Sequence, residues 1–470
     1  MQLTFEMKRI GVTGASGFIG TALVGALLER GDFVRAFVRN PNTARLPSGA
    51  EVRQLDLTSE ADAASASKML DGLDAVVHLA GESVSGRWTA QKKKQIHDSR
   101  QLTTRRLVAA MRACAQPPRT LVSASASGYY GSRGDAPLTE ESSPGGDFLA
   151  RVCVDWEFEA NKAGERGVRV VCMRQGLVLG HAGGALGAML PPFKFGAGGP
   201  LGSGAQWWPW IHIADNVALY LLAIDREDIT GAVNAVSPDI ATNARFSQAL
   251  GHALRRPSLA FAPSPALKIV LGEFAATLMA SQLILPAKAE DSGFVWKHES
   301  LDHALLDLLD PASARDTGTV RFESSEKIRA GPLEAFDFFS SAANLQALAP
   351  PELQFHLITP LPIEMRRGTI IQYTLKMRGL PVRWKTLITK WRPGVSFTDV
   401  QLRGPYSLWR HDHDFEPSTD GVVVRDTIDY ALPLAPLSNL ALPMVRAVMR
   451  RIFDYRGMQL SRLLLPKMER

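Results

Sequence analysis

The feature that most constrains the fold is a strand, a glycine-rich turn and a helix near the start of the chain. Residues 8–13 have the pattern of an apolar strand, and Gly14, Gly17 and Gly20 follow at three-residue spacing. In such a turn the first glycine makes the tight bend, the second brings the backbone close to a pyrophosphate, and the third lets the helix pack closely on the strand. An amphipathic run and a second strand over 21–38 complete a βαβ unit. This order predicts a parallel α/β sheet that binds a dinucleotide.

The residue at the end of the second strand distinguishes NAD from NADP. An acidic residue there accepts hydrogen bonds from the ribose hydroxyls of NAD, whereas the 2′-phosphate of NADP requires a cation. The strand ends with Arg39, which predicts NADP(H); the alternative is a surface arginine without a ligand. The predicted cofactor contacts follow the first four strands and are Gly14, Ser16, Gly17, Phe18, Ile19, Gly20, Arg39, Asp56, Leu57, Leu79, Ala80, Gly81 and Glu82.

Strands and helices continue to alternate, which predicts a doubly wound parallel sheet of the Rossmann type. Further strands are expected at 51–55, 74–79, 120–123 and 168–172. Residues 180–209 are rich in glycine and proline, and an aromatic cluster at Trp207, Trp208 and Trp210 lies at their end. Such a stretch is typical of a lid or substrate loop. Helices are expected at 244–254, 266–285 and 301–309.

A small, polar segment over 310–319 interrupts this pattern and predicts a linker between two domains. The first domain would span 7–309 and the second 320–470. The second has a different order: a strand, a helix, several strands and a long final helix. Its strands are expected to include 369–375, 382–388 and 422–428. This order predicts an α+β domain with a concave pocket between sheet and helix.

Composition and charge argue against several classes of protein. The three cysteines form no CxxC pair, so neither a disulfide framework nor a zinc site is expected, and the cytoplasm is the simplest location. No apolar run reaches the ~20 residues of a membrane-spanning helix. Much of the net charge of +6 lies in 441–470, whose basic amphipathic pattern predicts a solvated helix face, with peripheral membrane contact as the alternative. No nucleic-acid motif accompanies it, so nucleic-acid binding is not expected.

Several ordered motifs resemble the epimerase-like atypical branch of the extended short-chain dehydrogenase/reductase superfamily. Beside the glycine turn they are 79–82, 123–131, 148–150, 199–204 and 210–215. The segment 260–309 resembles that branch's own C-terminal segment. The resemblance implies a Rossmann fold, NADP(H) binding and oxidoreductase or epimerase-like chemistry on a small-molecule substrate. It also implies that His212 and Asp215 cap a helix and shape the substrate lobe.

The superfamily uses a tyrosine and a lysine four residues later for proton transfer, with a serine upstream. In the matching motif Leu149 occupies the tyrosine position and Cys153 the lysine position. Leucine has no proton to give, and a neutral thiol carries no positive charge. The candidates that remain are Ser125, with Ser123 or Ser127 if the register differs, and the two phenols of Tyr129 and Tyr130. Loop packing is the alternative role for both tyrosines.

Residues 320–470 resemble the START-like helix-grip fold, which includes polyketide cyclases and the coenzyme Q-binding group. The resemblance is carried by 321–328, by the helix that contains 334–339 and by the basic final helix. It implies an apolar ligand between sheet and helix, with walls that could include Trp384, Trp391, Trp409 and Phe415.

His411 and His413 alternate on one face of an expected strand, with Asp412 and Asp414 on the other. Two histidines at this spacing could ligate a metal, but no third ligand is evident in the sequence, so no metal site is expected.

Two functions follow from these observations. The first is an NADP(H)-dependent oxidoreductase or epimerase-like enzyme fused to a domain that binds a hydrophobic ligand. The second is a catalytically degenerate NADP(H) sensor that couples cofactor occupancy to a partner or to the apolar ligand. The missing tyrosine and lysine favour the second function, and the remaining motifs favour the first.

Overall fold

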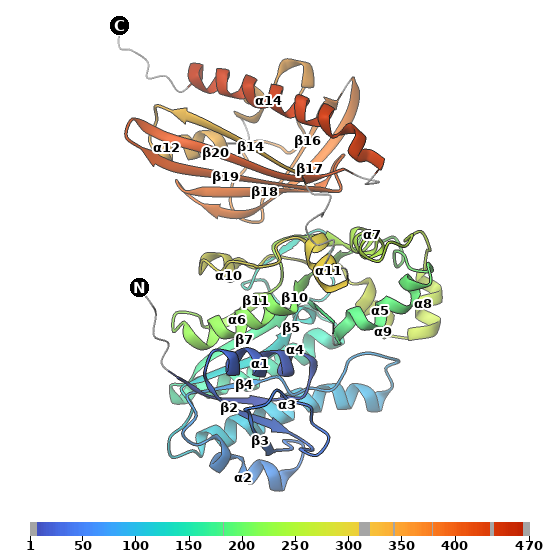
Figure 1. The fold of residues 1–470 in the computed structure, drawn as a ribbon, viewed down its shortest axis with the longest axis vertical. Helices are drawn as coiled ribbons and strands as arrows, with labels where there is room; N and C mark the ends of the chain where they lie inside the picture. Colours follow the sequence, from blue (N-terminus) through green and yellow to red (C-terminus); the bar gives the residue numbers. More distant parts are fainter. Residues whose placement is uncertain are drawn as a thin grey trace. The chain divides into compact units, whose positions relative to one another are not determined.

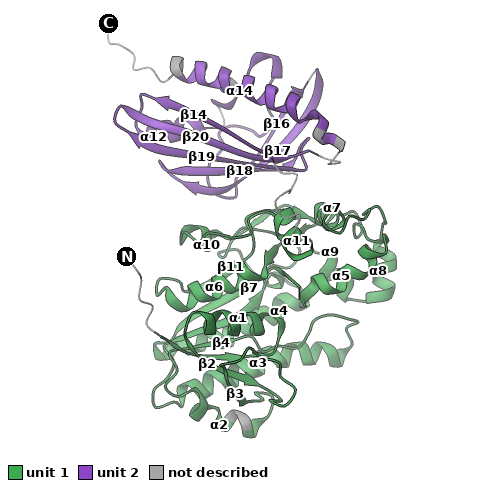
Figure 2. Ribbon diagram, viewed as in Figure 1, with its two compact units in different colours: residues 1–315 green, residues 316–470 purple. Residues whose placement is uncertain are grey.

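A computed structural model describes residues 7–181, 183–309, 320–341, 344–377, 379–432 and 437–463. The chain divides into two compact units, residues 1–315 and 316–470, which we describe separately as unit 1 and unit 2 (Figure 2). The division falls within the predicted linker, 310–319, which lies outside the described residues.

The described part of unit 1 is built on a seven-stranded parallel sheet (Figure 1). Its strands lie in the order β11-β7-β5-β4-β1-β2-β3, so the direction of winding reverses between β1 and β4. In sheets of this kind, ligands bind outside the carboxyl ends of the strands at the reversal. The strands are β1 (Arg9–Thr13), β2 (Phe33–Val38), β3 (Glu51–Gln54), β4 (Ala75–His78), β5 (Thr120–Ala126), β7 (Arg169–Gln175) and β11 (Gly231–Ala235). The predicted Rossmann-type sheet is confirmed.

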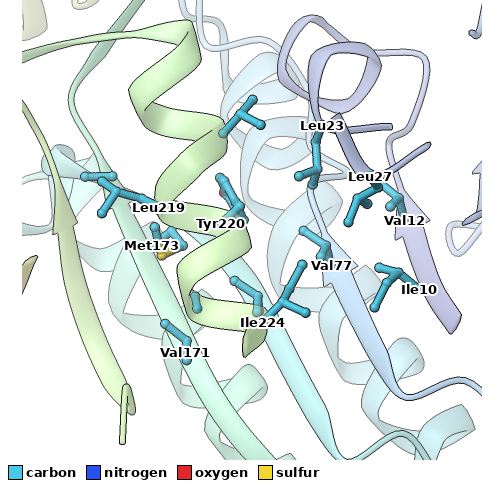
Figure 3. Close-up of a cluster of buried hydrophobic side chains, with 14 of the residues drawn as sticks. Ile10, Val12, Leu23, Leu27, Val77, Val171, Met173, Leu219, Tyr220 and Ile224 are labelled. Carbon is cyan, nitrogen blue, oxygen red and sulfur yellow. The ribbon is translucent and has the colours of Figure 1, made fainter. Parts of the chain in front are cut away.

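Helices cover both faces of this sheet because both faces of its strands are apolar. On one face, Leu23 and Leu27 pack with Val12, Val77 and Tyr220 (Figure 3). These residues join α1 (Phe18–Glu29) and α6 (Ile213–Asp225) to the sheet. The other face packs against α2 (Glu60–Leu70), α3 (Ala90–Arg112) and α4 (Phe148–Asn161).

The rest of unit 1 forms a lobe of short elements beside the sheet. It contains η1 (Ser127–Tyr130), β6 (Pro137–Leu138), β8 (Leu177–Gly180), α5 (Gly184–Lys194), β9 (Trp207–Trp208), β10 (Trp210–His212), β12 (Ala241–Thr242), α7 (Asn243–Ala253), α8 (Ser264–Leu271), α9 (Phe274–Met279), β13 (Leu283–Ile284), α10 (Ala287–Asp291) and α11 (Leu301–Leu309). The short helix η2 (Lys162–Arg166) instead joins α4 to β7 in the helical layer on the sheet. The helices predicted at 244–254 and 301–309 are confirmed as α7 and α11.

Two predictions for this lobe are wrong. The single helix expected over 266–285 is broken into α8 and α9, because Gly272 adopts φ +61° between them and ends the first helix. The stretch 180–209 is not loop throughout, since α5 lies in its first half and β9 near its end. Its tryptophans are core residues, with Trp207 and Trp208 at most 9% exposed.

Unit 2 is an antiparallel sheet with helices packed on it, as the predicted α+β class requires. The strand order is β14-β20-β19-β18-β17-β16-β15 (Figure 1). The strands are β14 (Val320–Ile328), β15 (His356–Leu357), β16 (Ile370–Met377), β17 (Leu380–Arg392), β18 (Ser396–Arg403), β19 (Leu408–Ser418) and β20 (Gly421–Ala431). The helical elements are α12 (Pro332–Ser340), α13 (Leu345–Leu348), η5 (Pro351–Leu353), η6 (Leu437–Ala441) and α14 (Leu442–Leu463).

One side of α14 packs on the sheet, where Met449 and Phe453 contact Ile428 and Tyr430. Among the described residues, no helix combines the length and apolar character needed to cross a bilayer.

The close approach at Gly20 gives the first testable prediction. Gly20→Ala should destabilise the protein by about 1–3 kcal/mol, as overpacking does, because the added methyl group would lie 2.3 Å from the carbonyl oxygen of Gly14. Gly25→Ala in the same helix is the matched control, since its methyl group meets nothing closer than Pro47 at 3.7 Å. The control should stabilise the protein by about 0.4–1 kcal/mol. Urea denaturation measures both, and equal midpoints for the two variants would contradict this packing.

Candidate functional site

The glycine turn joins β1 to α1 at the reversal point of the sheet. Gly14 adopts φ +66°, and a side chain there would lie 2.8 Å from the amide nitrogen of Ala80, just after β4. The amide of Gly17 donates to the carbonyl oxygen of Gly14 at 3.0 Å. Among the described residues, no side chain caps α1. Its first amide groups can therefore donate hydrogen bonds to phosphate oxygens.

The predicted cofactor residues lie along one edge of the sheet, because parallel strands end at the same edge. Arg39 is exposed directly after β2, and the loop that begins at Leu79 is tied to β1 by a 3.2 Å bond to the carbonyl oxygen of Thr13. After β3, the Asp56 carboxylate accepts bonds from the amide and hydroxyl of Thr58 at 2.9 and 2.6 Å.

Leu57, also predicted to contact the cofactor, is 5% exposed and packs in the core. Phe18 faces a different part of unit 1, because its ring lies against the backbone where β8 meets α5.

Glu82 lies among cations in the loop after β4. Lys92 of α3 pairs with its carboxylate at 2.7 Å. This hydrogen bond lowers the pKa of Glu82 against the opposing effect of burial, and the charges of Arg39 and Arg100 lower it further. Arg39, the residue predicted to bind the 2′-phosphate, is therefore close enough to the loop after β4 for its charge to act on Glu82.

Arg100 of α3 is a residue of this site that sequence reasoning missed. A side chain at Gly81 would lie 3.4 Å from the Arg100 guanidinium carbon. The guanidinium donates to the carbonyl oxygen of Ile96 at 3.0 Å and lies 5.1 Å from the ring centre of Trp156. No short motif contains this arginine, so only the packing of α3 beside the loop reveals it.

The positions of the missing tyrosine and lysine face the turn η1. A side chain at Gly128 would lie 3.3 Å from Leu149 Cβ and 3.8 Å from Cys153 Sγ. Cys153 is 3% exposed, and burial raises the pKa of its thiol to about 12. The thiol therefore stays neutral at ordinary pH and supplies no charge to the site.

A buried ion pair lies directly behind this surface. The Arg174 guanidinium of β7 binds both carboxylate oxygens of Glu157 on α4, each at 2.8 Å. The Ser125 hydroxyl donates to the same carboxylate at 2.6 Å. Since Arg174 is 4% exposed and Glu157 8%, loss of either partner would leave a buried charge, which typically costs about 3–5 kcal/mol.

The three predicted catalytic residues meet around Arg174. Tyr130 is fully buried, donates to Asn234 at 2.6 Å and accepts from Arg174 at 3.0 Å, and burial raises its pKa. Tyr129 is half-buried, and its ring centre lies 3.4 Å from the guanidinium carbon. The hydroxyls of Ser125 and Tyr130 are thus occupied in buried hydrogen bonds, so the geometry argues against their predicted role in proton transfer. Of the three candidates, Tyr129 keeps exposed surface.

His212 and Asp215 have contacts that fit the structural role expected for them. His212 Nδ1 accepts from the amide of Ala214 at 3.1 Å and caps α6. Burial lowers the pKa of His212 to about 4, which keeps the ring neutral. The Asp215 carboxylate accepts from the amides of Lys297 and His298 at 2.7 and 3.0 Å.

Unit 2 holds a cavity of about 420 Å³ between the sheet and α14. Trp384 and Trp409 line it, as predicted. The prediction is wrong for Trp391 and Phe415, whose ring centres lie 4.9 and 5.4 Å from that of Phe336. Both belong to the core beneath α12.

The expectation that no third metal ligand accompanies His411 and His413 is also wrong. β18 pairs with β19 and places Asp399 beside both rings. Its Oδ2 atom lies 3.6 Å from His411 Nδ1 and 3.2 Å from His413 Nε2.

Comparison with known protein families and structures agrees with the fold of unit 1. Residues 10–235 match the model of the NAD dependent epimerase/dehydratase family, and residues 262–308 match a domain of unknown function, DUF1731. The second match coincides with the segment 260–309, which resembled the C-terminal part of the predicted branch.

Individual relatives match over the same region. The chloroplastic epimerase family protein SDR39U1 homolog of Arabidopsis thaliana is 39% identical over 63% of this chain and 85% of its own length. YfhF of Bacillus subtilis is 33% identical over 64% of this chain and 97% of its own length. The crystal structure of human epimerase family protein SDR39U1 with NADPH is 34% identical, with a TM-score of 0.59, and covers 64% of this chain and 99% of that chain. The chain therefore belongs to the NAD dependent epimerase/dehydratase family, as a relative of the SDR39U1 proteins.

Proposed function

We propose that unit 1 binds NADP(H) and acts as an oxidoreductase or epimerase-like enzyme. The observation that carries this proposal is the uncapped start of α1 beside Gly17, with Arg39 at the end of β2. The amides of the turn would hold the pyrophosphate, and Arg39 would bind the 2′-phosphate. The human relative solved with NADPH supports the same cofactor.

Bound NADPH supplies only the hydride, so a side chain of the protein would have to donate the proton to the substrate. We assign this proton transfer to the Tyr129 hydroxyl. The Arg174 guanidinium packs on one face of the Tyr129 ring and holds it in place. Arg100 supplies a fixed positive charge near Cys153, where the superfamily's lysine would stand. In this arrangement Glu157 and Arg174 are positioning residues that keep η1 and α4 together.

The second candidate is a binding module without catalysis, and one observation favours it. Leu149 and Cys153 present an apolar, neutral surface to Gly128, where the superfamily has its acid and its cation. In that case, binding of the cofactor would change how the protein binds a partner or how unit 2 binds its ligand.

For unit 2 we propose a START-like helix-grip domain that binds an apolar ligand. The strand order, with β14 next to β20 and a long final helix across the sheet, supports this assignment. The cavity is lined mainly by aliphatic and aromatic side chains, and α14 contributes Val445, Val448 and Ile452. A largely apolar cavity with a few polar groups is the usual form of a small-molecule site.

Arg39→Asp should weaken NADPH binding far more than NADH binding, because a carboxylate repels the 2′-phosphate and can accept from the ribose hydroxyls instead. Arg119→Asp is the control, since Arg119 is also exposed but precedes β5 at the opposite edge of the sheet. Quenching of intrinsic tryptophan fluorescence would measure both affinities. Equal losses for the two nucleotides in Arg39→Asp would exclude this role for Arg39.

Tyr129→Phe should reduce NADPH oxidation with a panel of carbonyl compounds by about 10²- to 10⁴-fold, the usual contribution of a general acid. Its affinity for NADPH should not change. Tyr130→Phe is the matched control: it should keep the rate and lower the free energy of unfolding by about 1–3 kcal/mol through the unpaired Asn234 and Arg174 groups. A full rate in Tyr129→Phe would remove Tyr129 from the mechanism. NADPH binding without oxidation of NADPH in any wild-type reaction would favour the binding module.

Val448→Trp should weaken the binding of an environment-sensitive anilinonaphthalene dye by about tenfold or more, because the indole fills space in the cavity that the dye needs. Val395→Trp makes the same change at a residue that is 57% exposed in unit 2, and it should have no effect. Dye fluorescence titrations measure both variants. The proposal fails if both bind the dye as the wild type does.

A further inference from the structure

We propose that Asp399, His411 and His413 bind a divalent transition-metal ion whose open coordination positions face the cavity of unit 2. The site depends on neither NADP(H) binding nor the apolar ligand proposed above, and it shares only the cavity with the latter.

The sheet brings the three side chains together through its register. Asp399 of β18 pairs directly with His411 of β19, and His413 follows two residues later on the same face. The two imidazole rings lie with their centres 3.7 Å apart. All three side chains line the cavity. Their ligand atoms all lie within 4.8 Å of one another on two neighbouring, hydrogen-bonded strands.

The distances suit a metal site. Asp399 Oδ2 lies 3.6 Å from His411 Nδ1 and 3.2 Å from His413 Nε2. Donor atoms about 2.0–2.1 Å from one tetrahedral ion are roughly 3.3–3.4 Å from one another. Two imidazole nitrogens and one carboxylate oxygen form a donor set used for zinc and for non-haem iron, with positions left for water or a ligand.

Asp426 of β20 lies on the far side of both rings and fixes their orientation. Its Oδ1 atom is 3.0 Å from His411 Nε2 and 2.8 Å from His413 Nδ1. Metal binding requires the tautomers with N–H at His411 Nε2 and His413 Nδ1, facing Asp426, so that the lone pairs of His411 Nδ1 and His413 Nε2 would face the ion. Without an ion, His413 Nε2 lies at hydrogen-bond distance from Asp399 Oδ2. A carboxylate behind a metal-bound histidine is the usual arrangement.

Two further contacts complete this arrangement. Arg456 of α14 forms an ion pair with Asp426, with 3.2 Å between Arg456 Nη1 and Asp426 Oδ1, and balances its charge. The Thr386 hydroxyl donates to Asp399 Oδ1 at 2.9 Å, which leaves Oδ2 for the ion.

The charges also favour a cation. Asp426 is paired with Arg456, whereas the contacts of Asp399 in the cavity wall are the Thr386 hydroxyl and the two imidazoles that would share the ion. A metal ion would take the place of the proton between His413 Nε2 and Asp399 Oδ2. Buried charges are generally paired or bound to metal. An ion there could also coordinate an oxygen atom at one end of an otherwise apolar ligand.

A second group of three ligand-type residues among those described, His212, Asp215 and His298, provides a contrast. Asp215 uses both oxygens to accept backbone amides, and His212 Nδ1 caps α6. In that group the ligand atoms are used to hold the backbone, whereas Asp399, His411 and His413 contact one another and line a cavity.

The test uses the full-length protein after removal of metals with a chelator. Co²⁺ titration followed by visible absorption should show one ion per chain, displaced by Zn²⁺. His411→Ala and Asp399→Asn should abolish this binding. Asp399→Asn keeps the size of the side chain and the oxygen that accepts from Thr386. This variant therefore tests the site even if His411→Ala does not fold. Asp426→Asn should weaken binding by about 10- to 100-fold, as changes behind a metal ligand do.

His356→Gln is the matched control, because His356 is an exposed histidine of the same unit, on β15. It should bind Co²⁺ as the wild type does. Failure of the wild type to bind Co²⁺ and Zn²⁺ would overturn the proposal. So would unchanged binding in a folded Asp399→Asn variant, which would place the ion elsewhere. Neither result would affect the NADPH measurements on unit 1 or the dye measurements.

Discussion

Parallel pairing of β1 with both β2 and β4 is the constraint on which the site of unit 1 depends. It brings the ends of three strands to one edge, so that Gly14, Arg39 and Leu79 become neighbours although they are far apart in sequence. The close approach of Gly14 to Ala80 leaves no room for a side chain. The winding of the sheet therefore sets the place of the proposed nucleotide site, where the glycine turn would hold the phosphates and Arg39 would select the nucleotide.

The Arg174–Glu157 pair has a second, separate effect on the same site. It joins β7 to α4 inside the protein and engages the hydroxyls of Ser125 and Tyr130. A surface that in related enzymes carries proton-transfer groups is here supported by a buried salt bridge. Such a pair contributes less to stability than to holding one arrangement of the elements it joins, and we regard η1 and α4 as a rigid wall of the site.

Patterns that are local in sequence were predictable, and arrangements that depend on packing were not. The glycine turn and Arg39 could be recognised because one βαβ unit contains them. The helix expected over 266–285 failed because hydrophobic periodicity does not show that Gly272 takes a left-handed conformation. Asp399 and Arg100 were missed for another reason: the first reaches its partners only through antiparallel register, and the second only through helix packing.

The ring of Phe18 packs against the start of α5, so the glycine turn and the lobe beside the sheet are in direct contact. Methyl groups at Gly180 and Gly184 would lie 2.7 and 2.9 Å from the Phe18 ring, so the ring fills the space that side chains would otherwise occupy. Phe18 is also the first residue of α1, directly after the turn. The ring therefore sets the spacing between the start of α1 and the β8–α5 junction. A single aromatic side chain thus makes the packing of the lobe depend on the first residue of α1, and a smaller residue at position 18 would leave a cavity at this junction.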